Sequence, residues 1–167
     1  MTLTLYYIIS AIFDLAMGGI LVFAAIDDVK TRIVKPWIQY TILGISASHF
    51  LFVLFADLFS GIAEITWWNW AELLFAGALM FAIYITLVLI FKKGIGGADT
   101  KVSSMMAFYL GLWPSVIMVV GHFLSAIIYV VYEKLKNHKH IASVPLMVFI
   151  GIGYLVTLIV KWLTIII

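Results

Sequence analysis

The sequence predicts an all-α, polytopic membrane helix bundle, and three observations lead to that fold class. Hydrophobic residues make up 65% of the 167 residues and charged residues only 11%, which is not the composition of a soluble domain. Apolar runs of about 20 residues, long enough for a helix to cross a hydrocarbon core of about 30 Å, occur repeatedly along the chain. Alternating strand patterns are absent, so a bundle of helices is the expected way to satisfy the backbone in lipid.

Six apolar segments are expected to cross the membrane in turn. They are residues 5–26, 37–59, 71–91, 100–113, 114–132 and 144–167. Pro36 favours a fresh helix start before the second segment, and tryptophans before the third are typical of a membrane–water interface. The fourth segment is short and ends before Pro114, and the sixth carries Pro145 in its first turn. No internal repeat or linker divides the chain, so residues 1–167 are expected to form a single transmembrane domain.

The distribution of basic residues predicts the orientation of the bundle. Nine of the ten lysines and arginines lie in the first, third and fifth connections, and Lys161 alone lies toward the other side. Because basic connections stay in the cytoplasm, both the N-terminus and the C-terminus are expected outside. The N-terminus lacks the basic stretch of a cleavable signal peptide, so we treat it as mature. The lipid bilayer is the expected surrounding, and a net charge of +2 gives no reason to expect nucleic acid as a partner.

Two acidic positions that are far apart in sequence are expected at the same cytoplasmic boundary. Asp27 and Asp28 follow the first segment, and Asp99 opens the fourth. When two carboxylates meet, like charges disfavour double ionisation, so one can act as an acid while the other activates water. This is the chemistry of aspartyl proteases. Other hydrolytic chemistries lack their parts, since the chain has no cysteine, no His-Glu-x-x-His and no Gly-x-Ser-x-Gly.

A glycine-rich connection delivers Asp99 to this boundary. Residues 94–101 read GIGGADTK. The three glycines are Gly94, Gly96 and Gly97, and they are expected to give the loop flexibility and to let another chain approach closely. Lys101 is expected either to position Asp99 or to serve as an ordinary cytoplasmic lysine. The simpler alternative for the whole segment is a connecting loop that ends in a helix N-cap.

These acidic motifs resemble those of the type IV prepilin peptidases. Residues 28–32 read DVKTR and precede a nearby proline, while residues 96–101 read GGADTK, a form similar to the archaeal preflagellin and prepilin peptidase branch of these GxGD proteases. Residues 144–149, VPLMVF, are similar to a proline-containing span of that family. The resemblance implies a multi-pass aspartyl protease of the plasma membrane without a metal or cofactor. It also implies that Asp28 and Asp99 are the catalytic pair.

The resemblance further implies a substrate. In this family the enzyme cuts the short basic leader from pilin-like or archaellin precursors at the cytoplasmic face, just before the precursor's apolar segment. Two departures from the wider pattern are present: Ala98 precedes the second aspartate, and the proline after the first motif is displaced by one residue. The displacement leaves Asp27 as an alternative to Asp28. Family members that also methylate carry a zinc-binding cysteine loop, and this chain has no cysteine.

Helix ends suggest how the two aspartates divide their roles. Asp99 is expected at the N-terminal end of a helix, where free N–H groups and the helix dipole favour an anion, and Asp28 at the C-terminal end of another, where they do not. We therefore expect Asp99 to be the ionised base and Asp28 the protonated acid.

Asp14 lies inside the first apolar segment and raises two further possibilities. A buried acid in lipid needs a partner, and His49 and His122 are the candidates. Pairing of Asp14 with Asp99 would resemble presenilin, but Asp14 lies about 21 Å of helix outward of Asp28. The alternatives to a leader peptidase are another intramembrane aspartyl protease and a small proton-coupled transporter without enzymatic activity.

Overall fold

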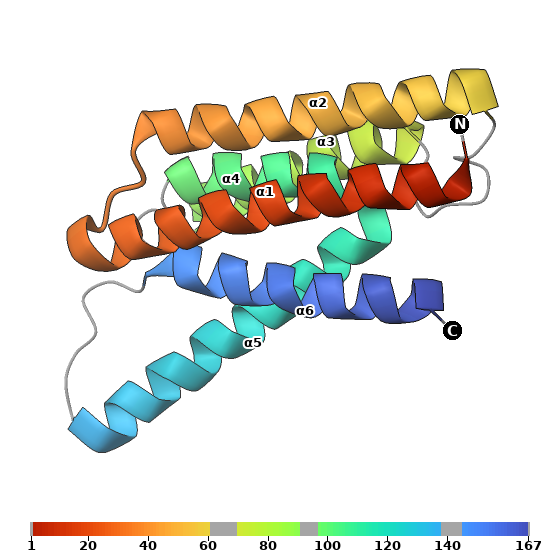
Figure 1. Ribbon diagram of the computed structural model, residues 1–167. Helices are drawn as coiled ribbons and strands as arrows, with labels where there is room; N and C mark the ends of the chain where they lie inside the picture. The colour runs from red at the N-terminus through yellow and green to blue at the C-terminus, as the bar shows by residue number, and fades with distance from the viewer. Residues whose placement is uncertain (1, 61–69, 91–96, 138–144, 167) are drawn as a thin grey trace.

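A computed structural model describes residues 2–60, 70–90, 97–137 and 145–166 of the chain (Figure 1). Over these ranges the chain forms six α-helices and no strand, which confirms the all-helical class. The helices are α1 (Leu3–Thr31), α2 (Pro36–Ser60), α3 (Trp70–Ile90), α4 (Gly97–Leu110), α5 (Leu112–Asn137) and α6 (Leu146–Ile166). Five of them are long and apolar enough to cross a membrane. The exception is α4, whose 14 residues extend for about 21 Å.

The first helix continues beyond the expected end of its apolar segment. Residue 26 was the expected end, but α1 runs on to Thr31 and therefore contains Asp27 and Asp28. The helix ends where Arg32 adopts a left-handed conformation, with φ of 57°, and its N–H donates to the carbonyl oxygen of Asp28 at 3.0 Å. Asp28 is thus held in the last turn of a helix, so the backbone fixes the direction of its Cα–Cβ bond.

The break between α4 and α5 falls at Gly111, earlier than the expected break before Pro114. Gly111 has a φ of 82°, a conformation that glycine adopts without steric cost, and its N–H donates to the carbonyl oxygen of Ala107 at 2.9 Å. The next N–H, that of Leu112, donates to the Glu72 carboxylate of α3 at 2.9 Å. Pro114 instead lies in the first turn of α5, where its missing N–H leaves no helical bond unmade.

One apolar core joins most of the bundle. Its buried side chains come from α1, α2, α4, α5 and α6, and include Met17, Ile38, Met106, Met118 and Ile150. A smaller cluster packs α3 against α4 through Ala76, Met80, Tyr84 and Ala107. The shortest helix is therefore also the central one, since α4 contributes to both clusters.

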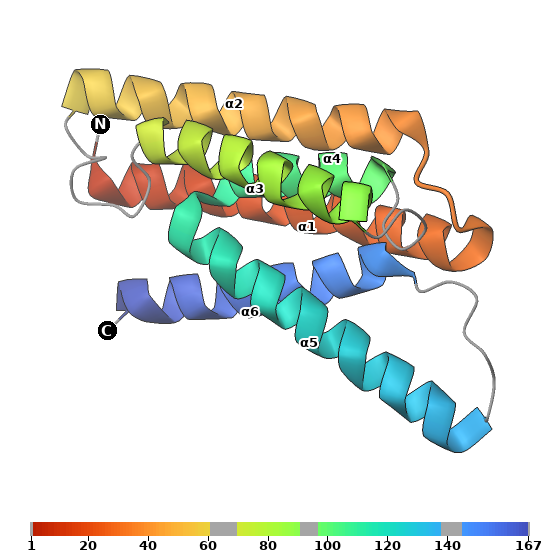
Figure 2. The same ribbon diagram turned by 180° about the vertical axis from the view of Figure 1, so that it is seen from behind.

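The arrangement of the helices gives the bundle two distinct ends (Figures 1 and 2). The last turn of α1 and the first turns of α4 and α6 lie at one end, which we call the Asp28 end. The beginning of α1 and the end of α6 lie at the other, which we call the Asp14 end. Both views also show α5 slanting across α6, with its later half directed away from α1 and α2. The two acidic motifs thus reach the same end of the bundle on different helices.

Candidate active site

The Asp28 carboxylate is buried, with 7% of the residue's surface exposed. Its Oδ2 accepts a hydrogen bond from the backbone N–H of Met147 at 3.0 Å. Met147 is the second residue of α6, and N–H groups in the first turn of a helix have no acceptor within that helix. Asp28 therefore caps α6 from another helix. Its second oxygen, Oδ1, accepts no hydrogen bond from the part of the chain that the structure describes.

This contact changes the electrostatic argument for the two aspartates. The sequence placed Asp28 at the unfavourable C-terminal end of one helix, and α1 does end three residues later. The N-terminus of α6, however, now faces the same carboxylate, so a helix N-terminus lies against Asp28 as well. Because Asp99 also lies in the first turn of a helix, the dipole argument no longer distinguishes the two carboxylates.

Asp99 lies in the first turn of α4 and is partly buried. Gly97 begins this helix and is exposed, and a Cβ added there would meet no atom within 4 Å, so packing does not require a glycine at this position. Lys101 is also exposed on α4 and forms no ion pair with any described residue. Gly94 and Gly96 lie outside the described residues. Of the predicted site, the structure therefore brings the helix ends that carry Asp28 and Asp99 to one end of the bundle.

Asp27 has a separate partner. Its Oδ1 accepts a hydrogen bond from the ammonium group of Lys35 at 3.0 Å, an ion pair in which the lysine side chain is 53% exposed. Lys35 belongs to the short connection between α1 and α2. Asp27 therefore links α1 to that connection, whereas Asp28 points to α6.

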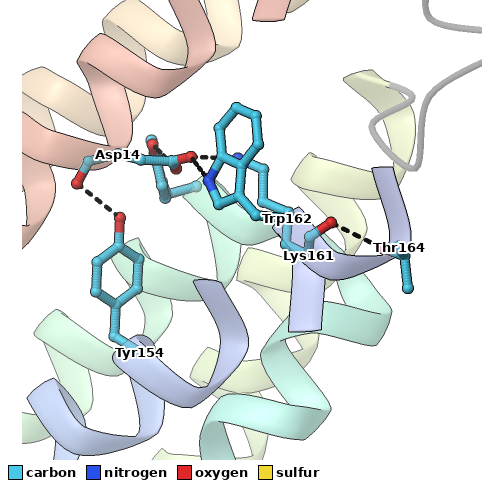
Figure 3. A network of polar contacts seen from close by, with 6 residues as sticks. Asp14, Tyr154, Lys161, Trp162 and Thr164 are labelled. Atoms are coloured by element: carbon cyan, nitrogen blue, oxygen red, sulfur yellow. Dashed lines mark hydrogen bonds and ion pairs between the residues drawn. The ribbon is translucent and has the colours of Figure 1, made fainter. Parts of the chain in front are cut away.

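Asp14 is the centre of a buried polar network at the other end of the bundle (Figure 3). Its Oδ2 accepts hydrogen bonds from Lys161 Nζ at 2.5 Å and from Trp162 Nε1 at 3.2 Å. Its Oδ1 accepts one from the Tyr109 hydroxyl at 2.7 Å, and its carbonyl oxygen accepts one from the Tyr154 hydroxyl at 3.1 Å. The network links α1 to α4 and α6, and both oxygens of the Asp14 carboxylate are occupied.

The expectation that a histidine would be the partner of Asp14 is wrong, because the ion pair is with Lys161. His49 instead packs its ring 4.5 Å from the ring of Tyr109, and His122 shares a hydrogen bond of 3.2 Å with the hydroxyl of Tyr84. Among the described residues, no group of three or more histidine, aspartate and glutamate side chains could hold a metal ion. The sequence analysis did not name Lys161 as the partner of Asp14. Lys161 is the one basic residue expected toward the outer side of the membrane, and that isolation was a signal that it pairs with an acid.

The sequence of this chain is similar to that of a known protease family. A sequence model of the type IV leader peptidase family matches residues 15–131. The matched range includes both Asp28 and Asp99 but ends before α6. No curated protein and no solved structure matches the chain. More than half of the chain is therefore similar to one family of proteases, and the helix that contacts Asp28 lies beyond that similarity.

Proposed function

This chain belongs to the type IV leader peptidase family, and from that membership we propose that it is an aspartyl endopeptidase that removes the short basic leader of pilin-like or archaellin precursors. Asp28 and Asp99 are its catalytic pair in this proposal. The observation that carries the proposal is the Asp28 carboxylate, which is held by one oxygen while the other accepts no bond from a described residue. The last turn of α1, which carries Asp28, lies at the same end of the bundle as the first turn of α4 (Figure 1).

The proposed reaction divides the work between the two carboxyl groups. The ionised aspartate takes a proton from water, and the water oxygen forms a bond to the carbonyl carbon of the scissile peptide. The protonated aspartate gives its proton to the carbonyl oxygen, which produces a neutral tetrahedral intermediate. The C–N bond then breaks as a proton passes to the leaving nitrogen. The Met147 N–H holds Asp28 in place through Oδ2 and leaves Oδ1 for proton transfer.

The position of the pair fits a substrate that enters from lipid. A precursor of the proposed class would lie with its apolar helix in the bilayer and its basic leader in the cytoplasm, so the peptide bond to be cut would lie at the boundary. Water reaches that depth without a channel. A small residue such as glycine before the cut would ease local unwinding of the substrate helix. The plasma membrane, the cytoplasmic orientation and the archaeal branch of the family are part of the same proposal.

The catalytic pair is tested by measuring cleavage with purified enzyme in proteoliposomes. The substrate is a synthetic precursor with a lysine-rich leader that ends in glycine, followed by an apolar helix of about 20 residues. Asp28→Asn and Asp99→Asn should each lower the cleavage rate by about 10²- to 10⁴-fold. Asp27→Asn is the matched control and should cleave normally. Cleavage by the Asp99→Asn enzyme at the normal rate would refute the pair.

The orientation is tested separately by labelling. The chain has no cysteine, so a single cysteine at the exposed Lys30 position gives a signal without background. In intact cells, Lys30→Cys should resist a membrane-impermeant maleimide and react once the cells are opened. Labelling in intact cells would place the Asp28 end outside and contradict a cytoplasmic active site.

A further inference from the structure

Polar contacts join α1 to α6 at two places, one toward each end of this helix pair. Asp28 accepts the N–H of Met147, and Asp14 accepts the ammonium group of Lys161. Fourteen residues separate the two aspartates on α1, and fourteen separate Met147 from Lys161 on α6. The two helices run in opposite directions (Figure 1), so equal lengths of helix lie between the contacts. Fourteen residues is about 3.9 turns, which keeps both contacts on nearly the same face of each helix.

This spacing makes the two contacts depend on a single register of α6 on α1. A slide of one residue would move α6 by about 1.5 Å along its axis. Hydrogen bonds from nitrogen donors have donor–acceptor distances of about 2.7–3.2 Å, so such a slide would break the backbone contact at Asp28 and displace the donors that meet Asp14. Any feature that fixes the register at Asp14 therefore also fixes which atom faces Asp28.

The Asp14 network has the properties of such a feature. The side chains of Lys161 and Asp14 are only 7% and 4% exposed. A buried ion pair stabilises a fold little more than well-packed apolar residues would, but it strongly disfavours arrangements in which a charge loses its partner. Trp162 adds a second donor from α6 to the same carboxylate oxygen, and Tyr154 adds a third from α6 to the Asp14 carbonyl oxygen. In the observed position of α6 all three donors reach Asp14, and a slide of one residue would displace them together.

We propose that the Asp14–Lys161 pair is a positioning pair for the active site, which holds α6 in the register that directs the Met147 N–H at Asp28. The pair does not touch the reacting atoms, and it acts through α6. This inference rests on the proposed role of Asp28 in cleavage. Asp14, Lys161 and Met147 all lie outside residues 15–131, so the family match assigns none of them a role.

The test follows the Met147 amide directly, independently of cleavage. The chain has seven methionines, of which Met1 carries the terminal amine, so protein labelled with ¹⁵N-methionine gives six backbone amide signals. The signal of Met147 is assigned as the one lost in Met147→Leu. The described backbone offers this N–H no helical acceptor, so its hydrogen exchange reports the contact with Asp28. The variant is Asp14→Asn with Lys161→Met, which removes both charges and leaves none buried alone. Glu72→Gln is the control, because Glu72 caps α5 rather than α6.

Exchange at Met147 should rise by about tenfold or more in the double variant, since a hydrogen bond to a carboxylate is lost. It should stay unchanged in Glu72→Gln and return close to normal when Lys161 is replaced by arginine alone. In the cleavage assay, kcat should fall in the double variant while KM stays within about twofold. If the double variant does not fold, Trp162→Phe removes one neutral donor and should give a smaller rise in the same exchange rate.

The outcomes separate this inference from the proposed function. Exchange at Met147 that stays at the control value in the folded double variant, or in Trp162→Phe when the double variant does not fold, would overturn the positioning role, whatever the enzyme cleaves. Faster exchange with normal cleavage would support the register but would overturn its role in positioning the active site, and it would leave the catalytic role of Asp28 to the Asp28→Asn variant. Faster exchange together with a lower kcat supports both.

Discussion

Asp14 and Asp28 lie on the same helix and are both buried, with 3% and 7% of their surfaces exposed, yet their surroundings differ. Both carboxylate oxygens of Asp14 accept hydrogen bonds, from Tyr109, Lys161 and Trp162. Asp28 accepts one, from a backbone N–H, and its other oxygen accepts none from a described residue. The comparison teaches that burial alone does not identify a reactive carboxylate. A saturated carboxylate can hold helices together, whereas proton transfer needs an oxygen that is free to exchange partners.

The largest expected effect is the loss of activity at Asp28 without a loss of stability. Asp28→Asn should lower cleavage by about 10²- to 10⁴-fold because the amide cannot exchange a proton. The amide oxygen can still accept the Met147 N–H, so the thermal unfolding midpoint in detergent should stay within a few degrees of the wild type. Both quantities are measured on the same preparation. A midpoint that falls as far as that of an Asp14 variant would mean that Asp28 is also a structural carboxylate.

The opposite behaviour is expected at Asp14. Asp14→Ala leaves the buried ammonium group of Lys161 without its partner, and breaking a buried ion pair in this way costs about 3–5 kcal/mol in the free energy of unfolding. Denaturant unfolding monitored by tryptophan fluorescence measures the loss. The control is Asp14→Ala combined with Lys161→Met, which should recover part of the stability. An equal loss in the single and double variants would show that the two charges are not coupled.

A third prediction asks whether packing against α5 also holds α6. A Cβ at Gly153 would clash with the carbonyl oxygen of Met118 in α5, whereas one at Gly151 would meet no atom within 4 Å. Gly153→Ala should therefore lower the free energy of unfolding by about 1–3 kcal/mol through overpacking. Gly151→Ala is the matched control and should not. If Gly153→Ala is as stable as its control, α5 and α6 can move apart at little cost. The position of α6 would then depend on its contacts with α1.

The smallest effect is expected at Asp27. Its ion pair with Lys35 is exposed on the lysine side, and such pairs contribute less than about 1 kcal/mol. Asp27→Asn should therefore leave both cleavage and stability close to the wild type, with any stability difference shrinking further at high salt. A strong loss of cleavage in this variant would make Asp27, rather than Asp28, the catalytic partner of Asp99.

Much of the fold could be predicted from the sequence, because apolar length and composition determine where helices lie in a membrane protein. The expected segments match the six observed helices, with α1 and α5 longer than expected because polar residues extend them. The break at Gly111 was missed because the nearby Pro114 is a stronger signal for a helix break in sequence. A proline is, however, also common in the first turn of a helix, which is where Pro114 lies.

The contacts of the two buried aspartates could not be predicted in the same way. Lys161 lies 147 residues from Asp14, and Met147 lies 119 residues from Asp28, so no local pattern connects them. The backbone N–H of Met147 carries no side-chain signal at all. Pro145, just before α6, did mark a helix start, and α6 was expected to begin at the depth of Asp28. A helix start at the depth of a carboxylate could have predicted that Asp28 accepts an N–H from the first turn of α6.

The short length of α4 has a consequence for how water reaches Asp99. Its 14 residues cover about 21 Å, while the hydrocarbon layer is about 30 Å thick. Because α4 packs inside the bundle, its shortness does not have to be matched by the lipid around the other helices. Non-helical backbone at membrane depth is tolerated where it is buried in protein or lines a water-filled cavity. A short central helix therefore allows water to reach Asp99, in the first turn of α4, from within the bundle while the five longer helices still cross the full layer.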